Sequence, residues 1–110
     1  MKINVDQVLQ VYGKTPGKKE DLVDAATGEP ILLRTVCINA LMYFNPKEPE
    51  PINEEEKKRR GKIADKIFEG GDVELESAEI AKIEAIMGKF FPTLVYNAVY
   101  VLLEQKEEKK

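Results

Sequence analysis

The 110-residue chain carries 17 Lys and Arg against 20 Asp and Glu, and it has one Cys and no His or Trp. A chain of this length folds as one domain and can bury about two-thirds of its unfolded surface without a metal or a disulfide. Without histidine it lacks the usual general base near neutral pH and the commonest metal ligand, so Ser-His-Asp and zinc-dependent chemistry lose their central residue. We therefore expect a protein that is not an enzyme, with no catalytic residue, no metal site and no cofactor.

The charge balance and the hydropathy pattern also exclude some kinds of binding partner. A net charge of -3 disfavours nucleic acid as a partner, because that affinity rests on clustered Lys and Arg. No apolar run reaches the roughly 18 residues of a membrane span, and residues 1–6 contain no hydrophobic signal region. Cys37 lies among apolar neighbours, where a small buried side chain is expected rather than a reactive thiol. These features predict a cytoplasmic protein that does not bind membranes.

The first 34 residues are predicted to be rich in β-structure. Val8–Tyr12 mixes β-branched and aromatic residues and predicts a short strand. Asp21–Asp24 and Pro30–Leu33 flank a loop in which Gly28 can adopt the positive φ that hairpin loops commonly require. Proline cannot donate to a ladder, so the last of these segments is expected either to lie at a sheet edge or to begin only at Ile31. The pattern predicts a small antiparallel hairpin or meander.

The helical part is predicted to begin with Thr35, which can cap a short helix over about Val36–Phe44. Three prolines within Asn45–Ile52 then predict an extended connector, because each proline restrains itself and the residue before it.

A second helix is predicted from Glu54, because Asn53 and the three glutamates that follow it form a capping box and meet the positive end of the helix dipole. Each of these glutamates has a Lys or Arg four residues later, a spacing that stabilises a helix by about 0.3 to 0.5 kcal/mol per pair. Gly70–Gly71 is predicted to end the helix. One stripe is expected to face the core: Ile63, Ala64, Ile67 and Phe68.

Two further helices are predicted. Ser77 can cap the third, which Gly88 is expected to end, and its buried stripe is Ile80, Ile83, Ile86 and Met87. Pro92 fits the start of the last helix, one face of which comprises Leu94, Val95, Ala98, Val99, Leu102 and Leu103. Residues 105–110 are expected to be a frayed charged tail.

The predicted fold class is therefore α+β and predominantly helical. A small N-terminal antiparallel hairpin or meander within residues 1–34 is followed by about four helices within residues 35–104. A single domain is expected over residues 1–110.

The last predicted helix has more apolar surface than one core-facing stripe needs. Nine of the ten residues in Leu94–Leu103 are apolar or aromatic. Tyr96, Tyr100 and Val101 lie off the core stripe, and tyrosine suits a half-hydrated interface because its hydroxyl keeps a polar partner. Together with Phe90 and Phe91, they are the candidate protein interface. The alternative is that the rest of the same chain encloses this helix.

An acidic stretch precedes the Ser77 helix, with Asp72, Glu74, Glu76 and Glu79 as its members. It lacks the residue arrangement of a calcium-binding loop. We interpret it as the solvated flank of that helix, because carboxylates stabilise helix N-termini. The alternative is an acidic surface that inhibits a host enzyme.

One basic run is also present, made of Lys57, Lys58, Arg59, Arg60 and Lys62. The preceding glutamates neutralise much of its field through their i to i+4 pairs, so a salt-bridged exposed helix is the favoured interpretation. The alternative is a nucleic-acid-associated regulator that uses this patch.

Four segments together resemble small proteins encoded by bacteriophages and prophages: Leu33-Arg-Thr-Val-Cys-Ile-Asn-Ala-Leu41, the charged helix from Glu54 to Ile67, Val73–Ile80, and Ile86-Met-Gly-Lys89. The resemblance spans about Ile31–Glu104 and rests on structural motifs, so it carries over no catalytic residue. It implies a phage-type accessory protein in a bacterial host cytoplasm. The surplus apolar surface of the last helix, rather than the resemblance, predicts how the protein acts: by binding a host or phage protein, or by self-association through that helix into a homo-oligomer.

Overall fold

The computed structural model of the chain describes residues 1–43 and 53–104. Within these residues there are four helices: α1 (Leu33–Met42), α2 (Glu54–Phe68), α3 (Ser77–Phe90) and α4 (Thr93–Leu103). There are also four short strands: β1 (Lys2–Asn4), β2 (Gln10–Tyr12), β3 (Lys19–Asp21) and β4 (Asp72–Glu74). The predicted α+β, predominantly helical class is confirmed.

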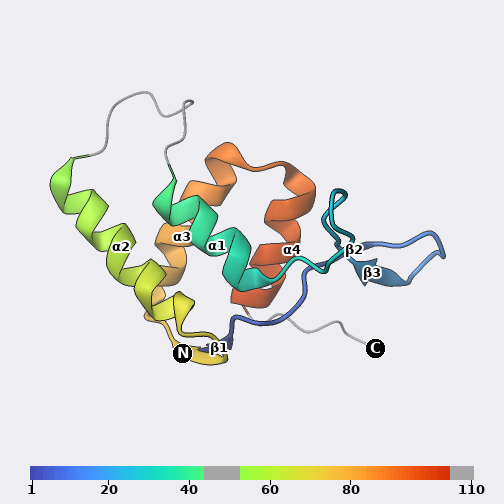
Figure 1. Cartoon of the computed structure of the whole chain (residues 1–110), viewed down its shortest axis with the longest axis horizontal. Helices are drawn as coiled ribbons and strands as arrows, with labels where there is room; N and C mark the ends of the chain where they lie inside the picture. The colour runs from blue at the N-terminus through green and yellow to red at the C-terminus, as the bar shows by residue number, and fades with distance from the viewer. Residues whose placement is uncertain (44–52, 105–110) are drawn as a thin grey trace.

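The strands form two separate antiparallel pairs. In one, β1 pairs with β4, so that Ile3 lies opposite Val73, a residue far from it in sequence. In the other, β2 pairs with β3 as a hairpin that projects to one side of the helices (Figure 1), with Val11 opposite Glu20. The pairing of β1 with β4 places the beginning of the chain beside the turn that joins α2 to α3.

The β2–β3 hairpin is not the predicted hairpin around Gly28, whose two sides are joined by a bridge from Val23 to Pro30 and by the Asp24 N–H, which donates to the Glu29 carbonyl at 2.8 Å. β2 lies within the predicted Val8–Tyr12 strand, whereas its partner is β3 rather than Asp21–Asp24. A turn closed by the Gly13 N–H, which donates to the Lys18 carbonyl at 2.9 Å, sets this earlier register. The predicted Pro30–Leu33 strand contributes only isolated bridges, Val8 to Leu32 and Val23 to Pro30.

The prediction that Thr35 caps the first helix is wrong. α1 begins at Leu33, and Leu32 occupies the N-cap position without a side-chain bond. The backbone of the N-terminal segment replaces the cap: the Leu33 N–H donates to the Gln7 carbonyl at 2.8 Å, and the Arg34 N–H donates to the Val5 carbonyl at 2.6 Å. Because these contacts satisfy N–H groups that a helix start leaves unpaired, the helix starts three residues earlier than predicted. Phe44 and the Asn45–Ile52 connector lie outside the described residues, as does the 105–110 tail.

The second helix follows the prediction closely. Asn53 caps it, since its Oδ1 accepts the Glu56 N–H at 2.8 Å, and Gly70 and Gly71 follow its end with positive φ. The three i to i+4 ion pairs are all present: Glu54 with Lys58, Glu55 with Arg59, and Glu56 with Arg60. Phe68 as a core residue is wrong, because its side chain at the last position of α2 is 70% exposed.

The ends of the third helix also differ from the prediction. Its N-cap is Glu76 instead of Ser77, and the Glu76 N–H donates to the Glu79 carboxylate at 2.9 Å. Gly88 does not end α3, which continues to Phe90. An interior glycine weakens a helix by only about 0.5 to 1 kcal/mol relative to alanine, and the following Phe90 and Phe91 pack against the core.

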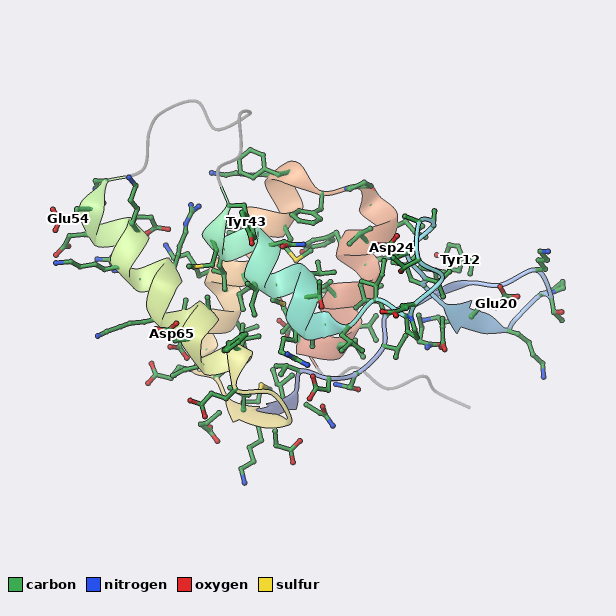
Figure 2. The ribbon with its side chains drawn as sticks, viewed as in Figure 1. Tyr12, Glu20, Asp24, Tyr43, Glu54 and Asp65 are labelled. Atoms are coloured by element: carbon green, nitrogen blue, oxygen red, sulfur yellow. The ribbon has the colours of Figure 1, made fainter. Side chains whose placement is uncertain are left out.

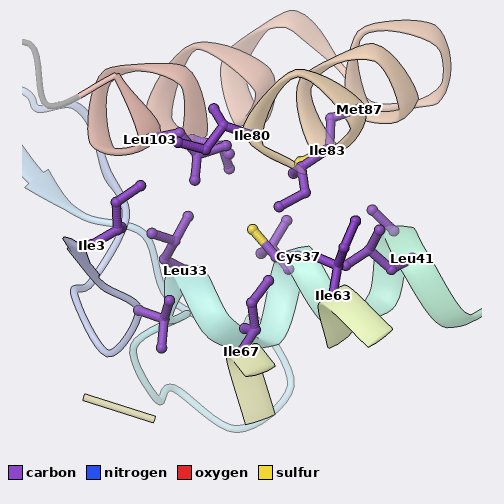
Figure 3. Packing of buried hydrophobic residues seen from close by; sticks show 14 of the residues in the cluster. Ile3, Leu33, Cys37, Leu41, Ile63, Ile67, Ile80, Ile83, Met87 and Leu103 are labelled. Atoms are coloured by element: carbon purple, nitrogen blue, oxygen red, sulfur yellow. The ribbon is translucent and has the colours of Figure 1, made fainter. Parts of the chain in front are cut away.

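One cluster of buried apolar side chains joins the helices and the β1–β4 pair (Figure 3). α1 lies at its centre, in contact with both α2 and α3. Cys37 is fully buried in this cluster, as predicted, and burial raises the pKa of its thiol to about 12. Other fully buried members are Ile3, Leu9, Leu33, Ile67, Leu75, Ile83, Met87, Val99 and Leu103.

Asp6 connects the N-terminal segment to α1 and to the turn after α2. Its carboxylate accepts the Gly71 N–H and the Arg34 Nε–H, each at 2.8 Å. The bond from the Gly71 backbone, followed by that from Arg34, holds the pKa of Asp6 below its ordinary value. Gly70 has φ +81°, and a Cβ added there would lie 3.2 Å from Asp6 Oδ2.

We expect Gly70→Ala to lower the free energy of unfolding by about 1 to 2 kcal/mol, because the left-handed backbone region penalises a Cβ by this amount. Gly61→Ala is the matched control: Gly61 lies inside α2, and a Cβ added there meets open space. That change is expected to stabilise the helix by about 0.5 to 1 kcal/mol. Urea denaturation measures both, and two changes of the same sign would contradict this account of the turn.

Candidate functional site

A hollow of about 260 Å³ lies between the β2–β3 hairpin and α4. Its walls are largely apolar, and we call it the hairpin–α4 hollow. The hairpin contributes Gln10, Val11, Tyr12 and Lys19, and α4 contributes Thr93, Leu94, Asn97, Ala98 and Val101. Figure 2 places Tyr12 where the hairpin meets the helical part.

Two large apolar side chains stand exposed at this hollow. Tyr12 is 76% exposed and Leu94 is 46% exposed. The prediction that Leu94 belongs to the core-facing side of the last helix is therefore wrong. The buried residues of α4 are Ala98, Val99 and Leu103. Leu94 lies near the beginning of α4, on the side that faces the hairpin, because it lines the hollow with Val101.

The candidate interface residues occupy different sides of α4 and of the turn before it. Tyr96 and Tyr100 are half-buried and stack on each other, with ring centroids 6.0 Å apart. Tyr96 also lies beside Gly88 of α3. Phe90 and Phe91 are half-buried against the core, and Val101 lines the hollow. The structure thus joins Val101 to Leu94 and Tyr12 rather than to the tyrosine pair.

Sequence reasoning misses Tyr12 as a candidate interface residue. The sequence places it in a strand, and no local pattern indicates that this strand lies beside α4. Leu94 was missed because it fits the core stripe of α4 by spacing. The surplus of apolar residues in α4 was the signal that could have identified it.

The acidic stretch is engaged mainly in local structure. The Glu79 carboxylate accepts both the Glu76 N–H and the Lys66 ammonium, the latter at 2.8 Å. Burial opposes ionisation of Glu79, but these two hydrogen bonds outweigh it and lower its pKa. Glu74 accepts a bond from the Met1 amino group, and this bond lowers the pKa of Glu74. Asp72 and Glu76 are exposed.

The basic run does not form one continuous patch. Arg60 is only 8% exposed, and its Nε donates to Glu56 Oε2 at 2.9 Å. Lys58 and Arg59 pair with glutamates of the first turn, and Lys57 and Lys62 are exposed. One member therefore points into the protein, and two are partly neutralised by carboxylates.

No protein-family model, curated protein or solved structure matches the chain. The resemblance to phage proteins thus stays a prediction. None of the helices in residues 1–43 and 53–104 is both long and apolar enough to cross a membrane. In the same residues, no group of three or more Cys, Asp or Glu side chains is arranged to hold a metal ion.

Proposed function

We propose that the chain is a non-enzymatic protein-interaction module that binds a second copy of itself through the hairpin–α4 hollow. The observation that carries this proposal is the exposure of Tyr12 and Leu94 at the edge of an apolar hollow. Burial of apolar surface contributes about 25 cal/mol per Å², and exposed aromatic side chains at a hollow commonly anchor protein interfaces.

The resemblance to phage-encoded accessory proteins supplies the expected setting. In that setting the module acts in the cytoplasm of a bacterial host, as a homo-oligomer or bound to a host or phage protein. The last helix contributes Leu94 and Val101 to the proposed contact, and the hairpin contributes Tyr12.

Light scattering over a range of concentrations tests this proposal. We expect the native chain to form a dimer, and Leu94→Glu to raise its dissociation constant at least tenfold, because the change places a charge in an apolar contact. Glutamate near the start of α4 suits the helix dipole, so the fold should persist. Phe68→Lys is the control: it also replaces an exposed apolar side chain by a charged one, at the end of α2, away from the hollow.

A native chain that stays monomeric at every concentration would refute self-association. Equal weakening by Leu94→Glu and Phe68→Lys would indicate that loss of any exposed apolar side chain weakens the dimer, and it would also count against the hollow. If Tyr96→Ser weakened the dimer while Leu94→Glu did not, the contact would lie on the tyrosine pair instead.

A further inference from the structure

A second surface lies on the side of the molecule away from the hairpin, between α2 and α3 (Figure 1). It is a groove of about 190 Å³, which we call the α2–α3 groove. Its lining residues are Arg59, Lys62, Ile63, Ala78, Glu79 and Lys82. None of these residues lines the hairpin–α4 hollow, so the two surfaces are separate.

Two ion pairs connect the helices that form the groove. Lys66 of α2 donates to Glu79 of α3 at 2.8 Å, and Lys82 of α3 donates to Glu56 of α2 at 2.9 Å. α1 packs against both helices. These ion pairs join the two walls of the groove to each other, and α1 supports both walls from the core side.

The groove combines an apolar floor with cationic sides. Ile63 is almost fully buried in the core beneath it, and Ala78 is exposed on α3. Arg59, Lys62 and Lys82 are the basic side chains along it. An apolar side chain could rest on the floor while a carboxylate next to it reached these three cations.

Positive charge is in excess around the groove. Glu56 alone receives Lys82 and Arg60 at 2.9 Å and Arg59 at 3.6 Å. Burial opposes ionisation of Glu56, but the bonds from Lys82 and Arg60 outweigh it and lower its pKa. Lys62 makes no ion pair or hydrogen bond with any described residue. The lining residues and their ion-pair partners comprise four cations, Arg59, Lys62, Lys66 and Lys82, and three carboxylates, Glu55, Glu56 and Glu79.

We propose that the α2–α3 groove binds an acidic segment of a partner protein, with a Glu or Asp carboxylate between Arg59, Lys62 and Lys82 and a neighbouring apolar side chain on Ile63 and Ala78. A local excess of positive charge on a chain whose net charge is -3 gives this surface a complementarity that steers acidic partners to it. Nucleic acid fits less well. It needs cations in a row along its phosphates, whereas here Arg60 is buried and the glutamates of the first turn of α2 lie nearby.

Titration of the isotope-labelled chain with the peptide acetyl-Glu-Leu-Glu-Leu-Glu-amide tests the proposal by NMR. The expected result is a set of amide shifts centred on Lys62, Ala78 and Lys82, with an affinity that falls as salt screens the charges. Lys62→Glu is expected to weaken binding at least fivefold. Lys57→Glu makes the same charge change on the same helix outside the groove lining, and it is expected to weaken binding less than twofold.

Three results would overturn the proposal. One is the absence of shifts in the groove, and another is equal weakening by Lys57→Glu and Lys62→Glu. The third is stronger binding of a thymidine oligonucleotide than of the acidic peptide at the same residues, which would assign the groove to nucleic acid. Substitution of Gln for Glu in the peptide should abolish the shifts. Self-association is tested separately, because Lys62→Glu should leave the light scattering unchanged and Leu94→Glu should leave peptide binding unchanged.

Discussion

Glu84→Gln is expected to make the protein more stable than the native chain at pH 8, by about 1 to 3 kcal/mol, and to have little effect at pH 4.5. Glu84 lies on α3, and its Oε2 is buried without a hydrogen-bond partner among the described residues. The Glu104 carboxyl, just after α4, lies beside it. Burial, followed by the hydrogen bond and the negative charge of Glu104, raises the pKa of Glu84 to about 7 from an ordinary value of 4.5.

The sign of the pH dependence follows from where the proton is held more tightly. Between pH 4.5 and about 7 the folded chain keeps a proton on Glu84 that the unfolded chain releases. The folded state binds more protons in this window, so the free energy of unfolding falls as the pH rises through it. Glutamine is neutral at every pH and still donates a hydrogen bond to Glu104. Glutamine therefore removes the cost of ionising a buried carboxyl above pH 7, and it changes little else.

Urea denaturation at pH 4.5, 6, 7 and 8 measures the effect. Glu69→Gln removes the same charge from an exposed position on the residue after α2 and should give a curve parallel to that of the native chain. Glu104→Gln separates the two causes, because it removes the neighbouring charge and leaves Glu84 buried. If the stability of Glu84→Gln and that of the native chain changed in parallel from pH 4.5 to 8, the raised pKa of Glu84 would be contradicted.

The parts of the fold that sequence reasoning predicted are those fixed by local contacts. α2 is the clearest case: its cap joins Asn53 to Glu56, and three of its ion pairs join residues four apart. All of these interactions can be read from spacing alone. The buried stripes of α2 and α3, apart from Phe68 at the end of α2, were also predictable, because a helix turns its apolar positions to one side at a known period.

Contacts between distant residues account for the errors in α1 and in the strands. α1 begins early because Leu33 and Arg34 donate to carbonyls of the N-terminal segment, and these partners lie far from the helix in sequence. Likewise, β4 exists because β1 supplies its hydrogen bonds from the beginning of the chain. Three-residue strands carry too little periodicity to be recognised alone. Their existence depends on which segments the core brings together.

The candidate surfaces also contain some residues that the sequence indicates and others that only the fold brings together. Val101 was identified because α4 contains more apolar residues than one face needs, whereas Tyr12 becomes relevant only once the hairpin lies beside α4. In the α2–α3 groove, Arg59 and Lys62 belong to the basic run, but Lys82 comes from another helix. No spacing rule joins residues on two helices whose packing depends on a third, α1. Some residues of each surface could thus be predicted from the sequence, but their arrangement in space could not.

Leu9→Ala is expected to destabilise the hairpin and the helices together, by about 2 to 5 kcal/mol. Leu9 is fully buried in the common cluster. Its N–H donates to the Ile31 carbonyl at 2.9 Å, and its carbonyl accepts the Leu22 N–H at 2.8 Å. The backbone of Leu9 thus lies at the base of the hairpin, while its side chain lies in the core cluster that the helices share, so a cavity there removes contacts of both parts.

The measurement is urea denaturation followed by two signals, circular dichroism of the helices and NMR resonances of β2 and β3. A single domain predicts that both signals change at the same denaturant concentration, in Leu9→Ala as in the native chain, because one cooperative unit unfolds as a whole. Val23→Ala is the control, since Val23 is exposed in the loop after β3, and it should change stability by less than about 0.5 kcal/mol. If the hairpin of Leu9→Ala melted first while the helices kept native stability, the hairpin would be a separate unit. The hairpin–α4 hollow would then open before the core unfolds, and self-association would weaken with it.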